Sequence, residues 1–122
     1  MKNKIVMDSA GDLQSLEGVD FASVPMKIVA EDREFVDSPG TDVSEMIRYL
    51  GSYRGKTSTA CPGVGEYLEA FEDAENVYCV TITSGLSGSY NAAAIAAQTY
   101  IASLFDGIII FGNKLNRIFS KK

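Results

Sequence analysis

The stretch NVYCVTITSGLSGSYNAAAIAAQ, residues 76–98, carries the strongest secondary-structure signals in the chain. Its first eight residues are a continuous run rich in β-branched and aromatic side chains, which is typical of an interior strand. Its alanine-rich second half, from Asn91 onward, has high helix propensity. A loop of serines and glycines lies between the two. The stretch therefore predicts a strand, a Ser/Gly loop and a helix in succession.

The rest of the chain repeats this alternation of strands and helices. Helix-spaced apolar residues, preceded by the capping pair Asp42 and Glu45, predict a helix over residues 41–53. A second helix follows the segment KTSTACPG, with Pro62 in its first turn and an apolar face made of Val64, Tyr67, Leu68 and Phe71. Further strands are predicted at residues 4–7, 21–29, 33–37 and 107–111. This order predicts an α/β fold, with a mostly parallel sheet flanked by helices, in a single domain over residues 1–122.

The composition favours one cytoplasmic globular domain. The 122 residues are 46% hydrophobic and 22% charged, which suits one core. Sixteen acidic residues against 11 basic ones give a net charge of −5, and the basic residues do not form the stripe that nucleic acid requires. No apolar run approaches the roughly 20 residues of a membrane span. The two cysteines, Cys61 and Cys79, are expected to be reduced and structural.

The Ser/Gly loop is a candidate anion-binding site. Ligands of open α/β sheets bind at the carboxyl ends of the strands, and a helix start offers unpaired amides and partial positive charge. Gly85 and Gly88 allow close approach of the backbone, while Ser84, Ser87 and Ser89 offer hydroxyl donors. The alternative is that Ser87 only caps its helix and the glycines serve the turn. This loop by itself favours neither interpretation.

Two other loops carry similar side chains. Thr57, Ser58 and Thr59 precede the second predicted helix, and Asp8 and Ser9 follow the first predicted strand. The topology would bring these loops to the same rim of the sheet, where they could share one anion. Ordinary helix capping and a solvated turn are the alternatives for these two loops.

Several catalytic sites are excluded by spacing or composition. The segment GSYRGKT, residues 51–57, has three residues between its glycines where a phosphate-binding P-loop needs four, and it follows a helix. The segment GLSGS lacks the second glycine of a nucleophile elbow, and the chain has no histidine to act as a base. Its carboxylates are dispersed, so neither a metal site nor a cofactor is predicted.

Three segments in order resemble the amino-terminal part of the DegV family. They are DSAGDL with VPMKI after it, KTSTACPGVGEYLEAFE, and ITSGLSGSYNAA. DegV proteins are bacterial proteins that bind a fatty acid and present its carboxyl group to a fatty acid kinase. The resemblance covers about residues 3–100, and residues 104–122 form a divergent tail.

The resemblance implies a fatty-acid carrier and not an enzyme. It implies that Thr57, Ser87 and the amide of Gly88 contact the ligand carboxylate. Second-rank members of this site are Ser58, Ser84, Asn91, Asp8 and Ser9. Hydroxyls and amides suit a carboxylate, which needs short hydrogen bonds and no base. The chain departs from the family pattern at Ala60 and Cys61, where a proline and a serine are expected.

The resemblance also implies that a carboxyl-terminal domain is absent, because family members are more than twice this length. That domain would supply the far wall of the acyl tunnel, so an exposed apolar face is expected to drive homodimerisation. Two alternative functions remain open. One is a small-molecule enzyme that uses the same helix-start loops as an anion site, with Asp8 as its acid or base. The other is a structural or interaction fragment that binds no ligand.

Overall fold

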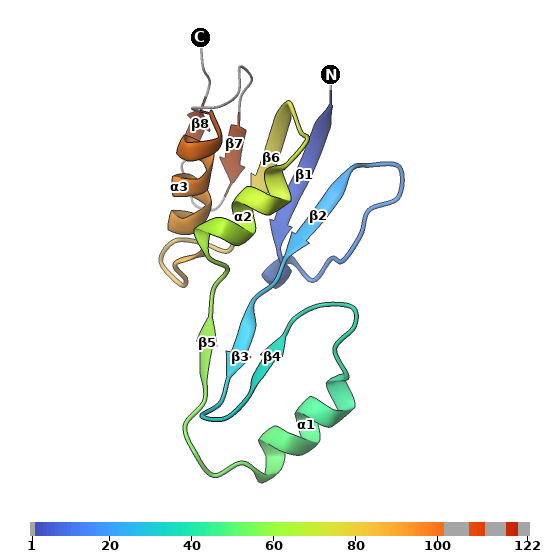
Figure 1. Ribbon diagram of the computed structural model, residues 1–122, viewed down its shortest axis with the longest axis vertical. Helices are drawn as coiled ribbons and strands as arrows, with labels where there is room; N and C mark the ends of the chain where they lie inside the picture. The colour runs from blue at the N-terminus through green and yellow to red at the C-terminus, as the bar shows by residue number, and fades with distance from the viewer. Residues whose placement is uncertain (1, 102–107, 112–116, 120–122) are drawn as a thin grey trace.

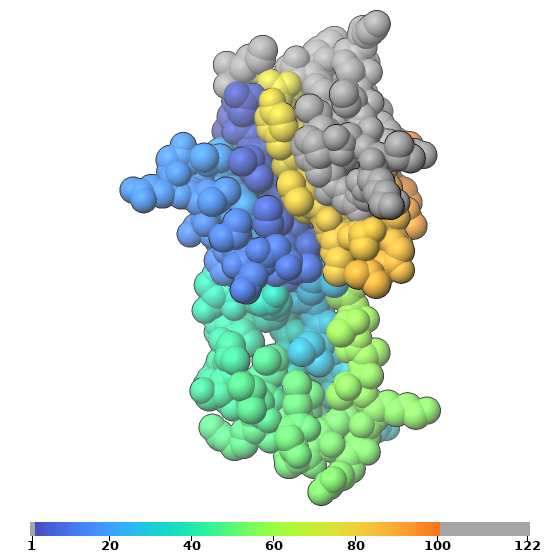
Figure 2. All heavy atoms as spheres, turned by 180° about the vertical axis from the view of Figure 1, so that it is seen from behind, coloured from blue at the N-terminus to red at the C-terminus, as the bar shows by residue number. Residues whose placement is uncertain are grey.

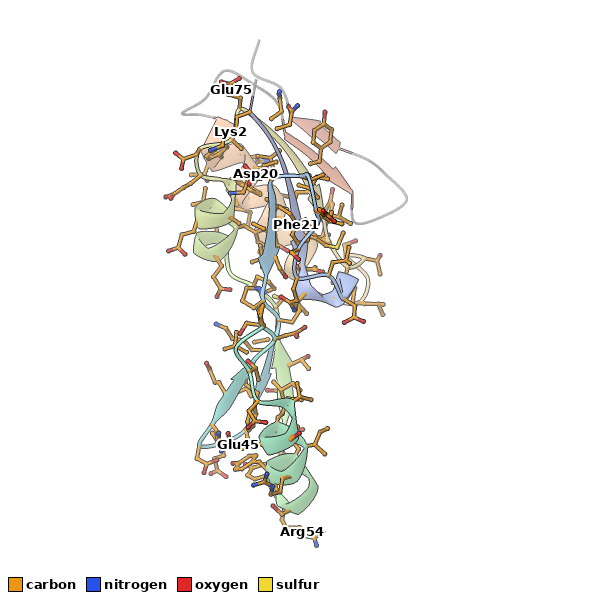
Figure 3. All side chains as sticks on the ribbon, turned by 90° about the vertical axis from the view of Figure 1, so that its right-hand side faces the viewer. Lys2, Asp20, Phe21, Glu45, Arg54 and Glu75 are labelled. Carbon is orange, nitrogen blue, oxygen red and sulfur yellow. The ribbon has the colours of Figure 1, made fainter. Side chains whose placement is uncertain are left out.

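The structure is a computed structural model that describes residues 2–101, 108–111 and 117–119. Figure 1 shows two parts arranged along the long axis, which we call the large lobe and the small lobe. In Figure 3, Lys2 and Glu75 lie at the outer end of the large lobe, and Arg54 lies at the outer end of the small lobe. The molecule is therefore elongated, with its two sheets in different lobes.

The large lobe contains a five-stranded sheet. In spatial order its strands are β2 (Phe21–Val24), β1 (Asn3–Asp8), β6 (Asn76–Val80), β7 (Ile108–Phe111) and β8 (Arg117–Phe119). The first four run parallel to one another, and β8 is antiparallel to β7. The helices α2 (Val64–Phe71) and α3 (Ser89–Ile101) lie on one face of this sheet (Figure 1). The predicted α/β fold with a mostly parallel sheet is confirmed.

The small lobe is inserted between β2 and α2. It contains an antiparallel sheet in the order β4-β3-β5 together with the helix α1. These elements are β3 (Lys27–Val29), β4 (Glu34–Val36), α1 (Val43–Ser52) and β5 (Ser58–Ala60). The predicted cap is confirmed, because the Asp42 side chain accepts a hydrogen bond of 3.0 Å from the Glu45 amide. The chain returns from β5 to the large lobe at α2 (Figure 1).

Three local predictions differ from the structure. The single strand predicted over residues 21–29 is two strands, β2 and β3, because Pro25 has no amide hydrogen for the ladder. Next to it, the Met26 amide donates to the Ser9 hydroxyl at 2.8 Å. The segment predicted as a hydroxyl-rich loop contains the short strand β5, which has no apolar alternation to reveal it. Pro62 lies before α2 instead of inside its first turn, since Gly63 is the residue that caps the helix.

The core lies between the helices and the sheet of the large lobe. Tyr67 and Phe71 of α2 have no exposed surface. The Phe71 ring contacts the rings of Tyr67 and Tyr100, at centroid distances of 6.1 and 5.6 Å. Small buried residues of α3 let that helix approach the sheet closely; they are Ala93, Ala96 and Ala97. The apolar face predicted for the second helix is therefore the centre of the core.

The opposite face of the large sheet is not covered by α2 or α3. Val6 and Cys79 are register partners and are buried toward the helices. Because side chains alternate along a strand, the neighbouring partners Ile5 and Tyr78 point the other way. Tyr78 is 40% exposed, and Figure 2 shows atoms of β1 and β6 at the surface of this face. We call this the open face of the sheet.

Candidate functional site

The parallel strands β1 and β6 run toward the small lobe (Figure 1), and a groove lies beyond their carboxyl ends. Its volume is about 480 Å³. Its lining comes from the β2–β3 junction, from β5 and the residue after it, and from the Ser/Gly loop between β6 and α3. The lining residues are Met26, Thr59, Cys61, Ile82, Leu86, Ser87 and Gly88. We call this the interlobe groove, because both lobes contribute to it.

Ser87 contributes a hydroxyl donor to the groove, and Gly88 lies next to it. The Ser87 hydroxyl oxygen accepts a hydrogen bond of 3.2 Å from the Ser89 amide. Its own hydrogen is then available to donate into the groove. A Cβ atom on Gly88 would lie 3.2 Å from the Cys61 sulfur, so only glycine fits here without displacing a neighbour. The predicted Ser/Gly loop therefore faces the groove with a small residue beside a hydroxyl donor.

Asp8 lies behind this loop and is 1% exposed. Its Oδ2 atom accepts hydrogen bonds from the Ile82 amide at 2.9 Å and from the Ser89 hydroxyl at 2.6 Å. The Tyr67 hydroxyl lies 2.5 Å from the same Ser89 oxygen. Since Ser89 gives its one hydroxyl hydrogen to Asp8, Tyr67 is the donor in that contact. These residues form a directed chain of hydrogen bonds from Tyr67 through Ser89 to Asp8.

Burial shifts the acid–base behaviour of two groups near this chain. It raises the pKa of Tyr67 well above its ordinary value, so this hydroxyl keeps its hydrogen at neutral pH. Burial, reinforced by the negative charge of Asp8, also raises the pKa of the Cys79 thiol. Cys61 and Cys79 are both free thiols, and Cys79 stays protonated. Neither group is therefore an activated nucleophile or base at neutral pH.

The other predicted site residues lie at different places. Thr57 and Ser58 are exposed, just before and at the start of β5, and neither lines the groove. Ser84 is half-buried in the Ser/Gly loop, and Asn91 is exposed on α3. Ser9 is buried and accepts the hydrogen bond from the Met26 amide. Of the site residues that the family resemblance implied, Ser87 and Gly88 are the two that line the groove.

Sequence reasoning named Thr59 among the hydroxyl residues of its loop without assigning it to the carboxylate, and it missed Cys61 as a lining residue of the groove. The signal that would have placed both in the groove is the alternation of a strand. Side chains at positions 57, 59 and 61 fall on one face when residues 58–60 are extended, as they are in β5. Thr57 therefore shares the face of the two lining residues, one repeat farther along the chain.

A second, smaller cavity of about 160 Å³ shares Ile82 with the groove. Apolar side chains contribute much of its lining, and the buried Thr81 hydroxyl beside it has no hydrogen-bond partner. Its lining residues are Met7, Asp8, Ala10, Gly11, Val80, Thr81 and Ile82. The site as a whole thus pairs neutral donors at Ser87 and Gly88 with apolar surface around Ile82.

Metal binding and membrane insertion find no support in the described part of the chain. Within it, no three side chains of the His, Cys, Asp and Glu types gather closely enough to hold a metal ion. None of its helices is long and apolar enough to cross a membrane. Neutral hydroxyl and amide donors beside apolar surface suit a ligand that joins a hydrogen-bond acceptor, such as a carboxylate, to an apolar body.

The fold and the groove define an α/β domain that has hydrogen-bond donors and apolar surface together at the carboxyl edge of its sheet. The model of the DegV family, described as a family of uncharacterised proteins, matches residues 2–111. The chain belongs to the DegV family. A curated relative, a DegV domain-containing protein of Streptococcus pneumoniae, is 38% identical over 102 residues. The predicted family resemblance is confirmed.

Two solved structures are similar to this chain in fold and in sequence. A DegV family protein from Eubacterium eligens, loaded with heptadecanoic acid, has a TM-score of 0.86 and 36% identity over 89% of this chain. The fatty acid kinase (Fak) B3 protein of Streptococcus pneumoniae, loaded with linoleic acid, has a TM-score of 0.85 and 37% identity over 91% of this chain. The chain spans 40% and 41% of these two proteins, and 36% of the length of the S. pneumoniae relative.

Proposed function

We propose that this chain binds a long-chain fatty acid and holds its carboxylate in the interlobe groove. The observation that carries the proposal is the Ser87 hydroxyl, which accepts from the Ser89 amide and so has its hydrogen free to donate into the groove. A carboxylate accepts such bonds without any change of protonation. The fatty acids held by two similar DegV structures support the same ligand class.

The apolar surface beside Ser87 suits the acyl chain of this ligand. Met26, Ile82 and Leu86 line the same groove as Ser87. The adjoining cavity of about 160 Å³ is close to the roughly 150 Å³ that accommodates a six-carbon ligand such as benzene. An acyl chain that passes Ile82 would therefore bury several methylenes there, each contributing about 0.8 kcal/mol.

The proposed role is to present the carboxyl group to a fatty acid kinase, without chemistry of its own. The similarity to a fatty acid kinase B3 protein supports this partner. Leu86 is 76% exposed next to Ser87, so the carboxylate site lies at the surface where a partner can reach it. Asp8, the residue considered as an acid or base, is buried behind the loop with Oδ2 already bonded twice. This geometry favours binding over catalysis.

Replacing Ser87 by alanine is expected to weaken fatty-acid binding about tenfold, because one hydrogen bond to a charged group is lost. The measurement is isothermal titration with linoleic acid, preceded by organic extraction and mass spectrometry of the protein as purified. The unchanged protein is expected to yield a fatty acid in the extract. A Thr57→Ala arm tests the second predicted carboxylate contact in the same way.

Ser52→Ala is the matched control for Ser87→Ala. Ser52 is exposed at the end of α1 and bonds only to backbone oxygens of its own helix, at 3.2 and 3.1 Å. If the Ser87 and Ser52 variants bind linoleic acid with equal affinity, the ligand carboxylate does not bind at Ser87 in the groove. If the wild-type protein neither carries nor binds fatty acid, the proposed function is wrong and a structural or interaction fragment without a ligand is favoured.

We also propose that two copies associate through the open face of the sheet. Mostly parallel sheets are normally covered on both faces, yet Tyr78 on this face is 40% exposed. Multi-angle light scattering at micromolar concentration is expected to give twice the monomer mass, and Tyr78→Glu is expected to restore the monomer. Leu13→Glu, at a similarly exposed residue outside the sheet, should leave the dimer intact. A monomer mass for the wild-type protein would contradict this proposal.

A further inference from the structure

We infer that Asp8 is a positioning residue, which fixes the Ser/Gly loop so that Ser87 presents its hydroxyl hydrogen to the ligand. The expected effect of Asp8 on ligand affinity rests on the proposed function, fatty-acid binding. The sequence suggested that Asp8 contacts the ligand or acts as an acid or base. The hydrogen bonds of its side chain point to an indirect role.

The first argument is that Asp8 holds both ends of the loop. Ile82 is two residues past the end of β6, and Ser89 is the first residue of α3. Both donate to the same Asp8 oxygen, at 2.9 and 2.6 Å. Between them the loop has two glycines and one described backbone hydrogen bond of its own, from Leu86 to Thr83 at 3.0 Å. Glycine-containing loops lose much entropy on ordering, so clamping both ends reduces the cost of forming the site.

The second argument is the direction of the hydrogen bonds. Tyr67 donates to Ser89, and Ser89 donates to Asp8, so the Ser89 side chain is held by two partners. The amide of the same residue donates to the Ser87 oxygen. That bond uses only the oxygen of Ser87 and leaves its hydroxyl hydrogen for an acceptor in the groove. The buried chain thus holds Ser89, whose amide in turn holds the Ser87 oxygen beside the groove.

The third argument concerns charge. A carboxylate that faced the groove directly would repel a carboxylate ligand. Asp8 is instead 1% exposed, and its Oδ2 atom is occupied by two donors from the loop. A buried charge is tolerated when it is hydrogen-bonded. Its position is therefore explained by the loop that it holds and not by a hydrogen bond to the ligand carboxylate.

The test compares two tyrosine variants, one whose hydroxyl belongs to the hydrogen-bond chain that leads to Asp8 and one whose hydroxyl does not. Tyr67→Phe removes the first hydroxyl of the chain, whereas Tyr100→Phe removes a hydroxyl that donates to the Ala74 carbonyl at 2.8 Å. Both rings contact Phe71, but Tyr67 has no exposed surface and Tyr100 is half-buried, so the free energy of unfolding of each variant is measured beside its affinity. Tyr67→Phe is expected to weaken linoleic acid binding about fivefold, the effect of one hydrogen bond, and Tyr100→Phe to leave affinity unchanged. Equal losses in both variants would overturn the inference.

Asp8 itself is tested by two substitutions. Asp8→Asn keeps one carbonyl oxygen that can accept from both donors, whereas Asp8→Ala keeps none. The asparagine variant is therefore expected to bind linoleic acid at least about tenfold more tightly than the alanine variant, since it retains two hydrogen bonds. If asparagine is as damaging as alanine, the carboxylate charge acts directly and the positioning role is wrong.

Hydrogen exchange of the loop amides gives a readout that needs no ligand. Without fatty acid, Asp8→Ala and Tyr67→Phe are expected to accelerate exchange over residues 82–89, while Tyr100→Phe leaves it unchanged. Unchanged exchange in all variants would contradict the clamp. A protein that binds no fatty acid but shows the accelerated exchange would contradict the proposed function alone. The two ideas can therefore fail separately.

Discussion

Replacing Phe71 by alanine is expected to lower the free energy of unfolding by about 3–5 kcal/mol, which is typical of a large aromatic removed from a packed core. Phe71 has no exposed surface and lies in ring contact with Tyr67 and Tyr100. Its removal would leave a cavity between α2, α3 and the sheet. Chemical denaturation followed by circular dichroism measures the change.

Phe21→Ala is the matched control for this prediction. Phe21 is half-buried on β2, the edge strand of the large sheet (labelled in Figure 3). The same truncation there is expected to cost less, because less apolar surface is lost and solvent can fill the gap. If the two variants lose equal stability, the core is not centred on Phe71 and the packing of α2 is misassigned.

The large lobe could be predicted from the sequence because its signals are local and strong. The run at residues 76–83 and the alanine-rich segment after it each favour one secondary structure, and their order fixes a strand followed by a helix. The apolar spacing of Tyr67, Leu68 and Phe71 likewise identified the face of α2 that is buried in the core. Periodicity was sufficient wherever an element buries one face.

The helix of the small lobe and its strand at residues 33–37 were predicted, but the organisation of the lobe could not be, because it depends on tertiary contacts. β5 has three residues of the Ser, Thr and Ala types, a composition that loops share. It becomes a strand by pairing with β3, where Thr59 lies opposite Ile28. α1 has a strong helical pattern, yet no residue of it is buried, so the pattern gave the helix but not its location. A partner distant in sequence decides such elements.

The loop of the candidate site was predictable from the sequence, whereas the buried hydrogen bonds that hold this loop were not. Ser87 and Gly88 stood out because a Ser/Gly loop between a strand and a helix is a known position for anions. Asp8 was noticed, but its role depends on Ser89, which is 81 residues away along the chain. No spacing rule connects two such residues, so the direction of their hydrogen bond is visible only in the fold.

Gly88→Val is expected to weaken linoleic acid binding about a hundredfold, the largest loss among the groove variants. A Cβ atom added at Gly88 would lie 3.2 Å from the Cys61 sulfur. The two methyl groups of a valine are therefore expected to occupy the groove beside Ser87. They would obstruct both the Gly88 amide and the Ser87 hydroxyl, and two lost contacts of about 1.4 kcal/mol each correspond to this factor. Isothermal titration measures it.

Gly85→Val separates steric blocking from stiffening of the loop. A Cβ atom at Gly85 meets nothing within 4 Å, so this substitution restricts the same loop without filling the groove. It is expected to retain most of the affinity. Combining Gly88→Val with Cys61→Ala removes the sulfur that crowds the new side chain, so part of the lost affinity should return. If Gly85→Val is as harmful as Gly88→Val and the Cys61 change restores nothing, loop flexibility and not close approach at Gly88 controls the site.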